Sequence, residues 1–277
     1  MRMNSITKLN VLTLVFLSCL LASCQDKNQK NTENQNQPEF QNKGHELVYE
    51  MVQKVGDFSS LADKKSVEYT YTYVTADGGT DISQEKYLFD GEYSYGRYTT
   101  HERTLPQFEG DIEQGFNVTE YWLKHNGEVI TDEEALTRVK FNRPTNYYWF
   151  TMMQKLLDPG INYEYIGERP INDKEYHIVK ISFDSPDDKP TDTYQLYINK
   201  ETSIVDQFLF TVVDFGVEET PYLMLLDYEK IDGLLIPTKR KYKASTWNAD
   251  LSDEGWITVN WTDIKFDTGI TKEDFEN

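Results

Sequence analysis

Between residues 43 and 57, apolar side chains repeat at intervals of three and four residues: Leu47, Val48, Met51, Val52 and Val55. This spacing places them on one face of a helix. The segment that follows has a period of two instead, because Val67, Tyr69, Tyr71 and Tyr73 alternate with polar residues. A strand with one buried face shows that period. The pattern therefore predicts a helix followed directly by a sheet that it covers.

The tyrosine-rich strand continues into a hairpin. Asp77-Gly78-Gly79 is a turn sequence, and it predicts a second strand near residues 85–89. A third strand is expected at residues 92–100, with Tyr93 and Tyr95 on one face. A fourth is expected at residues 118–124, before the turn Asn126-Gly127.

Two helices are then expected to interrupt the strands. The first begins at Thr131-Asp132-Glu133-Glu134, where Thr131 is expected to cap the helix and Glu134 to reach back to it. The second covers residues 147–157, carries Trp149, Met152 and Met153, and ends before Pro159-Gly160.

The remainder of the chain predicts a meander of strands separated by turn residues. These strands are expected at residues 163–168, 175–183, 192–199, 204–214, 222–231, 234–246 and 256–266. Strands dominate and do not alternate with helices, so a parallel α/β sheet is disfavoured. The expected fold class is mainly β (α+β): about eleven antiparallel strands curved around about three helices, which pack on the concave side.

The amino terminus has the layout of a signal peptide. Arg2 and Lys8 precede the apolar run of residues 11–20, which is about half the ~20 residues that a membrane-spanning helix needs. The run ends at Leu21-Ala22-Ser23-Cys24, which resembles the lipobox of bacterial lipoproteins. That resemblance implies cleavage after residue 23 and lipidation of Cys24, the alternative being an ordinary cysteine near a conventional cleavage site.

Three segments follow from this layout: a signal peptide (1–23), a disordered lipid-anchored tether (24–42) and one domain (43–277). The tether has too few apolar side chains to offset the cost of ordering. Cys19 and Cys24 are the two cysteines of the chain, so the domain has neither a disulfide nor a thiolate metal site. The net charge of −19 argues against nucleic-acid binding.

Aromatic and methionine side chains supply the candidate ligand-binding residues: Tyr69, Tyr71, Tyr73, Tyr93, Tyr95, Trp149, Met152 and Met153. They could line a pocket for an apolar ligand, or they could simply pack the helix on the sheet. Phenolic hydroxyls in such number are poorly suited to a dry core, which keeps the pocket hypothesis open. We expect the pocket between the face carrying Tyr69, Tyr71 and Tyr73 and the helix carrying Trp149, Met152 and Met153.

No catalytic, cofactor or metal site is expected. The four histidines stand singly at positions 45, 101, 125 and 177, and neither a nucleophile elbow nor a phosphate loop occurs. One basic cluster, Lys239-Arg240-Lys241-Tyr242-Lys243, could meet anionic headgroups or a partner, or could be a strand that displays lysine outward.

The order of elements resembles the superfamily of the lipoprotein carriers LolA and LolB. The resemblance rests on the first helix and strand and on three segments, residues 193–202, 227–237 and 266–271. Within this superfamily, the sequence most resembles Bacteroidota lipoproteins of a domain-of-unknown-function family. The resemblance implies a curved half-barrel with helices on its concave side and an apolar cavity between them.

Three functions are compatible with the sequence. The favoured one is a lipid-anchored envelope lipoprotein, at the outer membrane rather than the inner membrane and periplasmic or surface-exposed, that binds a lipid, an acyl chain or another apolar molecule. The second is an envelope scaffold that binds a protein partner through a packed domain. The third is a carboxylate-based hydrolase, which would require two facing acids in a polar cleft.

Overall fold

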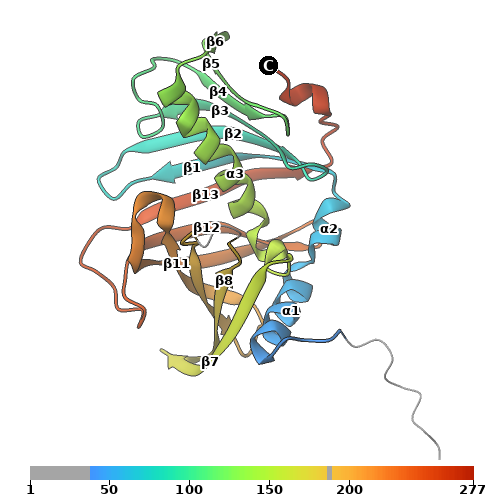
Figure 1. Ribbon diagram of the computed structural model, residues 1–277, viewed down its shortest axis with the longest axis vertical. Helices are drawn as coiled ribbons and strands as arrows, with labels where there is room; N and C mark the ends of the chain where they lie inside the picture. Colours follow the sequence, from blue (N-terminus) through green and yellow to red (C-terminus); the bar gives the residue numbers. More distant parts are fainter. Residues whose placement is uncertain (1–37, 186–188) are drawn as a thin grey trace, which may run out of the picture. The chain divides into compact units, whose positions relative to one another are not determined.

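Thirteen antiparallel strands form one sheet in the computed structural model, which describes residues 38–185 and 189–277 (Figure 1). The first six are β1 (Ser66–Val74), β2 (Thr80–Leu88), β3 (Tyr93–His101), β4 (Ile112–Phe116), β5 (Tyr121–His125) and β6 (Glu128–Ile130). The other seven are β7 (Ile161–Ile171), β8 (Lys174–Phe183), β9 (Thr193–Asn199), β10 (Val205–Val212), β11 (Val217–Ile231), β12 (Leu234–Ala244) and β13 (Ile257–Phe266). The sheet is unclosed and curved, as the sequence predicts.

The chain builds the sheet in two meanders that meet at the pair β1 and β13. Its order is β6-β5-β4-β3-β2-β1-β13-β12-β11-β10-β9-β8-β7, so β6 and β7 lie at opposite edges. Helix α3 (Glu133–Lys155) connects these edges. Its 23 residues span only ~35 Å, whereas thirteen flat strands would span about 58 Å. Curvature brings both edges within reach of α3 and its short flanking segments.

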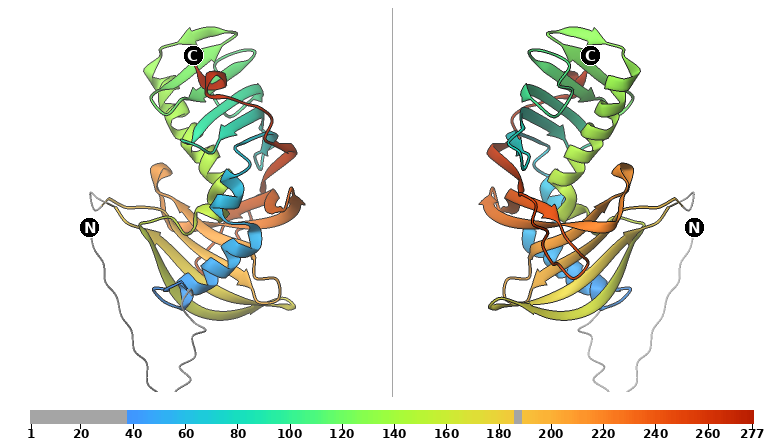
Figure 2. Two further views of the ribbon diagram at one scale, coloured as in Figure 1. Left: turned by 90° about the vertical axis from the view of Figure 1, so that its right-hand side faces the viewer. Right: turned by 90° about the vertical axis from the view of Figure 1, so that its left-hand side faces the viewer.

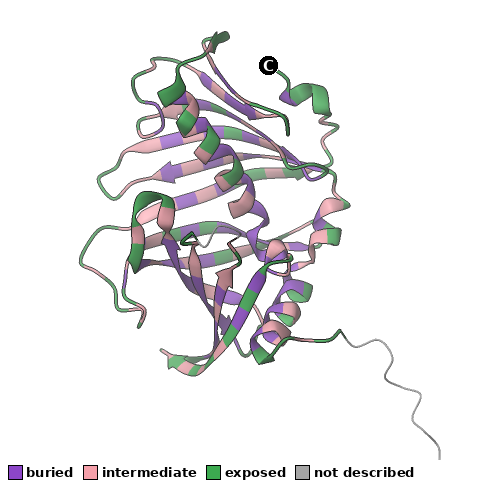
Figure 3. Ribbon diagram, in the orientation of Figure 1, coloured by how far each residue is buried: buried purple, intermediate pink, exposed green. Residues whose placement is uncertain are grey.

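Helices α1 (Lys43–Val55) and α3 lie on the same, inner face of the sheet, as the side views show (Figure 2). The short α2 (Phe58–Ala62) joins α1 to β1, and two 3-10 helices, η1 (Val213–Phe215) and η2 (Lys272–Phe275), lie in the second half. Buried positions concentrate on the strands beneath α1 and α3 (Figure 3). The main core is therefore the layer between the helices and the inner face.

The structure corrects three expectations about the helices and strands. The two helices predicted at 131 and 147 are the single helix α3, which continues through the exposed Pro144. Its cap is Asp132 rather than Thr131, because the Asp132 side chain accepts a hydrogen bond from the Ala135 amide. In addition, β4 and β6 were missed, and the strand expected at 118–124 begins at Tyr121.

The predicted signal peptide and Cys24 lie outside the described residues. The described end of the predicted tether already contacts the domain: Phe40 packs against the rings of His45 and Tyr49. Asn42 caps α1 and donates to the Tyr163 carbonyl of β7 at 2.7 Å. In residues 38–185 and 189–277, no helix is long and apolar enough to cross a membrane.

Candidate functional site

A cavity of about 120 Å³ lies between α3 and the inner face of the sheet. The strands contribute Tyr71, Tyr73, Phe210, Arg240, Tyr242 and Trp261 to its wall. The facing turns of α3 contribute Phe141, Asn142, Thr145, Asn146 and Trp149. Arg103, Val212, Met224 and Val259 complete it.

Strand register brings the sheet side of this wall together. Tyr71 pairs with Trp261 and Tyr73 with Val259 across β1 and β13. Arg240 of β12 also pairs with Val259. Since directly paired residues point to the same face of an antiparallel sheet, these side chains converge beneath α3.

Aromatic contacts hold the wall in place. The hydroxyls of Tyr73 and Tyr242 hydrogen-bond at 2.6 Å across three strands. On the helix side, the ring of Trp149 meets the ring of Phe210 edge to face, with centroids 5.2 Å apart. The wall is thus a fixed, largely aromatic surface, which suits an apolar ligand.

The cavity is open to solvent at its rim. Phe141, Thr145 and Val212 are only partly buried, and the guanidinium of Arg103 retains part of its exposure. A small molecule therefore has a path to the wall without unfolding of α3.

Arg240 is the most unusual member of the wall, because it is only 5% exposed and lacks an anionic partner. Its guanidinium stacks 3.7 Å from the ring centre of Trp261 and 5.9 Å from that of Trp149. Its Nε has no hydrogen-bond partner, and among the described residues no ion pair or hydrogen bond engages the group. Burial lowers the pKa of Arg240 to about 10, against an opposing influence of nearby tyrosines, so it is still charged at pH 7.

Two more arginines lie near the mouth. Arg103 stacks 4.2 Å from the ring centre of Tyr73, and its Nε lies 3.4 Å from a carboxylate oxygen of the buried Asp81. Burial and the nearby charge of Arg103 lower the pKa of Arg138. None of the described residues that line the cavity is acidic, so its wall is cationic in a chain of net charge −19. The wall also lacks the pair of carboxylates that the hydrolase hypothesis requires.

The structure brings three of the predicted ligand-binding residues to the cavity: Tyr71, Tyr73 and Trp149. Tyr69, Met152 and Met153 share the same layer but are at most 3% exposed and belong to packed clusters. They are core residues beside the cavity rather than parts of its wall.

Tyr93 and Tyr95 do not line this cavity, because they lie on the outer face of β3. Their strand neighbours Ser94 and Gly96 face α3. Tyr93 instead packs against Phe275 of η2, and Tyr95 against Trp122 and the Glu113 carboxylate. The alternation within β3 was predicted correctly, but the face was assigned wrongly, because the sequence contained no sign that the carboxyl-terminal segment covers the outside.

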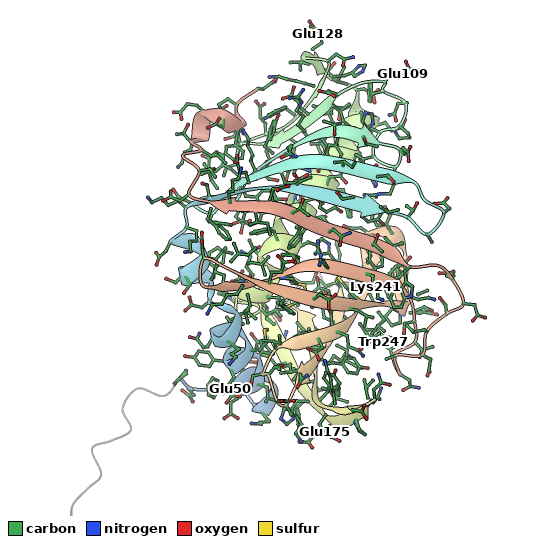
Figure 4. The ribbon with its side chains drawn as sticks, turned by 180° about the vertical axis from the view of Figure 1, so that it is seen from behind. Glu50, Glu109, Glu128, Glu175, Lys241 and Trp247 are labelled. Atoms are coloured by element: carbon green, nitrogen blue, oxygen red, sulfur yellow. The ribbon has the colours of Figure 1, made fainter. Side chains whose placement is uncertain are left out.

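Arg240, Trp261 and Arg103 were not identified from the sequence. A signal for Arg240 existed within the basic cluster: in a strand, Arg240 and Tyr242 face one side while Lys239, Lys241 and Lys243 face the other. The structure shows this division, with Arg240 in the cavity wall and Lys241 on the outer face (Figure 4). Lys239 and Lys241 are thus exposed, whereas Lys243 is buried near the ring of Trp256 and Arg240 lies in the cavity wall.

The described part of the chain has no group of three or more histidine, cysteine or acidic side chains placed to hold a metal ion. The size of the cavity limits its ligand more directly. An engineered cavity of about 150 Å³ binds benzene, and pockets for drug-sized ligands usually measure ~300 Å³ or more. The cavity therefore accommodates a ring-sized group or the end of one alkyl chain.

Comparisons with known proteins agree with this architecture. A family model described as "Family of unknown function (DUF6503)" matches residues 117–258, just over half of the chain. No curated protein matches. The crystal structure of a LolA superfamily protein from Nitrosomonas europaea has a TM-score of 0.50 at 11% identity, over 84% of this chain and 97% of that one. It supports the LolA-like fold. A putative outer membrane lipoprotein-sorting protein domain from Vibrio parahaemolyticus has a TM-score of 0.49 at 12% identity, over 84% and 96% of the two chains.

Proposed function

The chain belongs to the DUF6503 family of unknown function, and we propose that it is a lipid-anchored envelope lipoprotein that binds an apolar molecule between α3 and the sheet. The observation that carries this proposal is the half-open aromatic cavity around Tyr71, Trp149 and Trp261. A sheet packed only for stability would fill such a space, because cavities beneath helices reduce stability.

The anchoring part of the proposal rests on the amino-terminal sequence. Residues 1–23 would direct export, Cys24 would carry the lipid, and the residues that follow would tether the domain to the membrane. We place the protein in the cell envelope of a bacterium, Bacteroidota by its resemblance, at the outer membrane and on its periplasmic or exposed side. The LolA-like fold of the domain supports an envelope role, since the similar structure belongs to that superfamily.

The cavity favours a ligand smaller than a whole lipoprotein anchor. Three acyl chains would need α3 to move away from the sheet, whereas one chain end or one ring fits the present volume. The packed side chains of Tyr69, Met152 and Met153 favour the scaffold alternative in that part of the layer. The two hypotheses differ in one measurable property, namely uptake of an apolar probe.

Uptake can be tested with a fluorescent fatty acid added to the full-length protein. Quenching of Trp149 and Trp261 would report occupancy of the cavity, because both indoles form its wall. Thr145→Trp should fill the mouth and weaken uptake at least tenfold. Thr137→Trp, the same substitution at an exposed position of α3, is the matched control and should bind like the wild type. A wild-type protein that takes up no probe would support the scaffold alternative.

Anchoring is tested separately. Cys24→Ala should leave the precursor unprocessed or release the product from the membrane fraction, as fractionation and lipid labelling would show. Cys19→Ala removes the other cysteine of the chain and should be processed and anchored normally. Normal lipid labelling of the Cys24→Ala protein would exclude Cys24 as the anchor.

A further inference from the structure

The unpartnered charge of Arg240 narrows the class of ligand. We infer that the cavity takes the anionic end of a single-chain amphiphile, a carboxylate or a phosphate, which Arg240 binds while the apolar body lies against Trp149 and Trp261. This inference rests on the proposed function and adds to it the chemistry of the head group.

Hydrogen bonding gives the first reason. Stacking on Trp261 contacts the flat face of the guanidinium, whereas its five N–H donors lie in the plane of the group. The stacked indole cannot accept these donors, and no described residue does so. A buried cation without acceptors destabilises a fold, so an acceptor from outside the chain accounts for its presence.

The surrounding charges give the second reason. The described wall of the cavity has no carboxylate, and the buried Asp81 is engaged by Arg103 and by the Thr104 hydroxyl. Arg103 is part of the wall, and Arg138 lies 5.8 Å from the ring centre of Phe141 in that wall, so both add positive charge. An anion would thus enter a cationic site, although the acidic surface of the chain repels anions elsewhere.

The rest of the wall argues for an amphiphile rather than a free ion. Tyr71, Trp149, Phe210 and Trp261 offer apolar area that a bare phosphate would leave unused. Asn142 and Asn146 of α3 each donate one amide hydrogen within the protein, to Gln114 and to Tyr98. The second hydrogen of each amide can be donated to head-group oxygens. The partly open rim leaves room for the remainder of the chain to extend outward.

Titration calorimetry of the full-length protein with four probes tests this assignment: octanoate, octyl phosphate, octanol and inorganic phosphate. Octanoate, octyl phosphate or both should bind at least tenfold more tightly than octanol, since a hydrogen bond to a charged group contributes about 1.5–3 kcal/mol. Whichever acid binds more tightly identifies the head group. If inorganic phosphate binds as tightly as octyl phosphate, the inference that the ligand is an amphiphile is overturned.

Arg240→Met should abolish the preference for the anions over octanol. Its melting temperature should equal or exceed that of the wild type, because the variant removes a buried charge; a purely structural arginine would give a lower one. Lys241→Met is the matched control: it removes the same charge from the adjacent position, which is exposed on the outer face (Figure 4). It should keep the full preference.

The outcomes separate the two proposals. Equal binding of octanol and both anions by the wild type would overturn the role of Arg240 and leave the apolar cavity standing. Binding of none of the probes would overturn the proposed function itself. If Arg240→Met does not fold, two other variants give the same test. Arg240→Lys keeps the charge and should retain a preference for anions. Arg240→Gln removes the charge, and the folded protein should lose that preference.

Discussion

Two buried arginines on the inner side of the sheet have opposite surroundings. Arg143 of α3 is fully buried and donates to both carboxylate oxygens of Glu85, at 2.9 and 3.3 Å, and to the Tyr98 hydroxyl at 3.1 Å. Arg240 of β12 is nearly as buried, but its guanidinium lies against the indole faces of Trp149 and Trp261 and has no hydrogen-bond or ion-pair partner among the described residues. The Nε of both groups lacks a hydrogen-bond partner. The fold thus pairs one cation with a carboxylate and leaves the other without an anionic partner at a cavity.

The pKa shifts of the two groups express this difference. Burial is the largest single influence on Arg143 and lowers its pKa, but the carboxylate of Glu85 together with Tyr98 and Tyr87 raises the pKa above the ordinary value. For Arg240, burial lowers the pKa to about 10 and no carboxylate compensates. The buried ion pair between Arg143 and Glu85 fixes the position of α3 on β2. A buried charge without a partner, such as that of Arg240, is retained at a cost in stability, which is typical of functional sites.

The largest expected effect comes from breaking the satisfied pair. Glu85→Gln keeps the shape of the side chain but leaves Arg143 charged and unpaired in the core, so it should lower the free energy of unfolding by about 3–5 kcal/mol in urea titrations. Glu113→Gln, which changes an acid on the outer face of β4, should cost far less. Similar stability of the two variants would show that the Arg143 pair is not the main attachment of α3.

A methionine pair probes the same contrast through packing. Met152 and Met224 belong to one packed cluster and are 1% and 3% exposed, but of the two only Met224 lines the cavity. Met152→Ala should cost about 2–5 kcal/mol of unfolding free energy, and Met224→Ala less, because its side chain already lacks neighbours on one side. Only Met224→Ala should alter the affinity for octanoate. If Met152→Ala and Met224→Ala lose the same unfolding free energy, Met224 is packed on all sides in solution and the cavity beside it is not open.

Much of the sheet could be predicted from the sequence, and the reasons are local. The alternation from Val67 to Tyr73 and the turn residues at Asn126-Gly127 and Asp232-Gly233 each express a short-range preference. The same approach divided α3 into two helices, because the middle of the helix contacts the sheet through polar residues. Asn142 and Arg143 are buried there against Gln114 and Glu85, so the apolar stripe is interrupted between Val139 and Tyr147.

The cavity was only partly predictable for a different reason. Tyr71, Tyr73 and Trp149 could be grouped by strand and helix periodicity, but Arg240 and Trp261 reach them only through the pairing of β13 with β1 and β12. That pairing joins segments far apart in the chain. An arginine among lysines also resembles a solvated strand face until the strand is known to have a covered side.

The smallest expected effects come from a matched pair of tyrosine hydroxyls, one near each arginine. The Tyr87 hydroxyl donates to Glu85 at 2.9 Å and lies 2.9 Å from that of Tyr69. Its removal in Tyr87→Phe leaves buried partners unsatisfied and should cost about 1–3 kcal/mol. The Tyr71 hydroxyl has no hydrogen bond to any described residue, although its ring lines the cavity.

Tyr71→Phe should therefore change the unfolding free energy by less than about 0.5 kcal/mol. Its effect should appear in binding instead. Burial raises the pKa of Tyr71 while the nearby charges of Arg103 and Arg240 oppose the rise. The Tyr71 side chain lines the cavity together with Arg240, in the wall that a bound anion would contact. As a neutral donor there, it should strengthen octanoate binding several-fold and octanol binding little, so Tyr71→Phe should narrow the preference between them. A Tyr71→Phe protein that is as destabilised as Tyr87→Phe would mean that the Arg240 region is a second satisfied polar core, and the contrast between the two arginines would no longer hold.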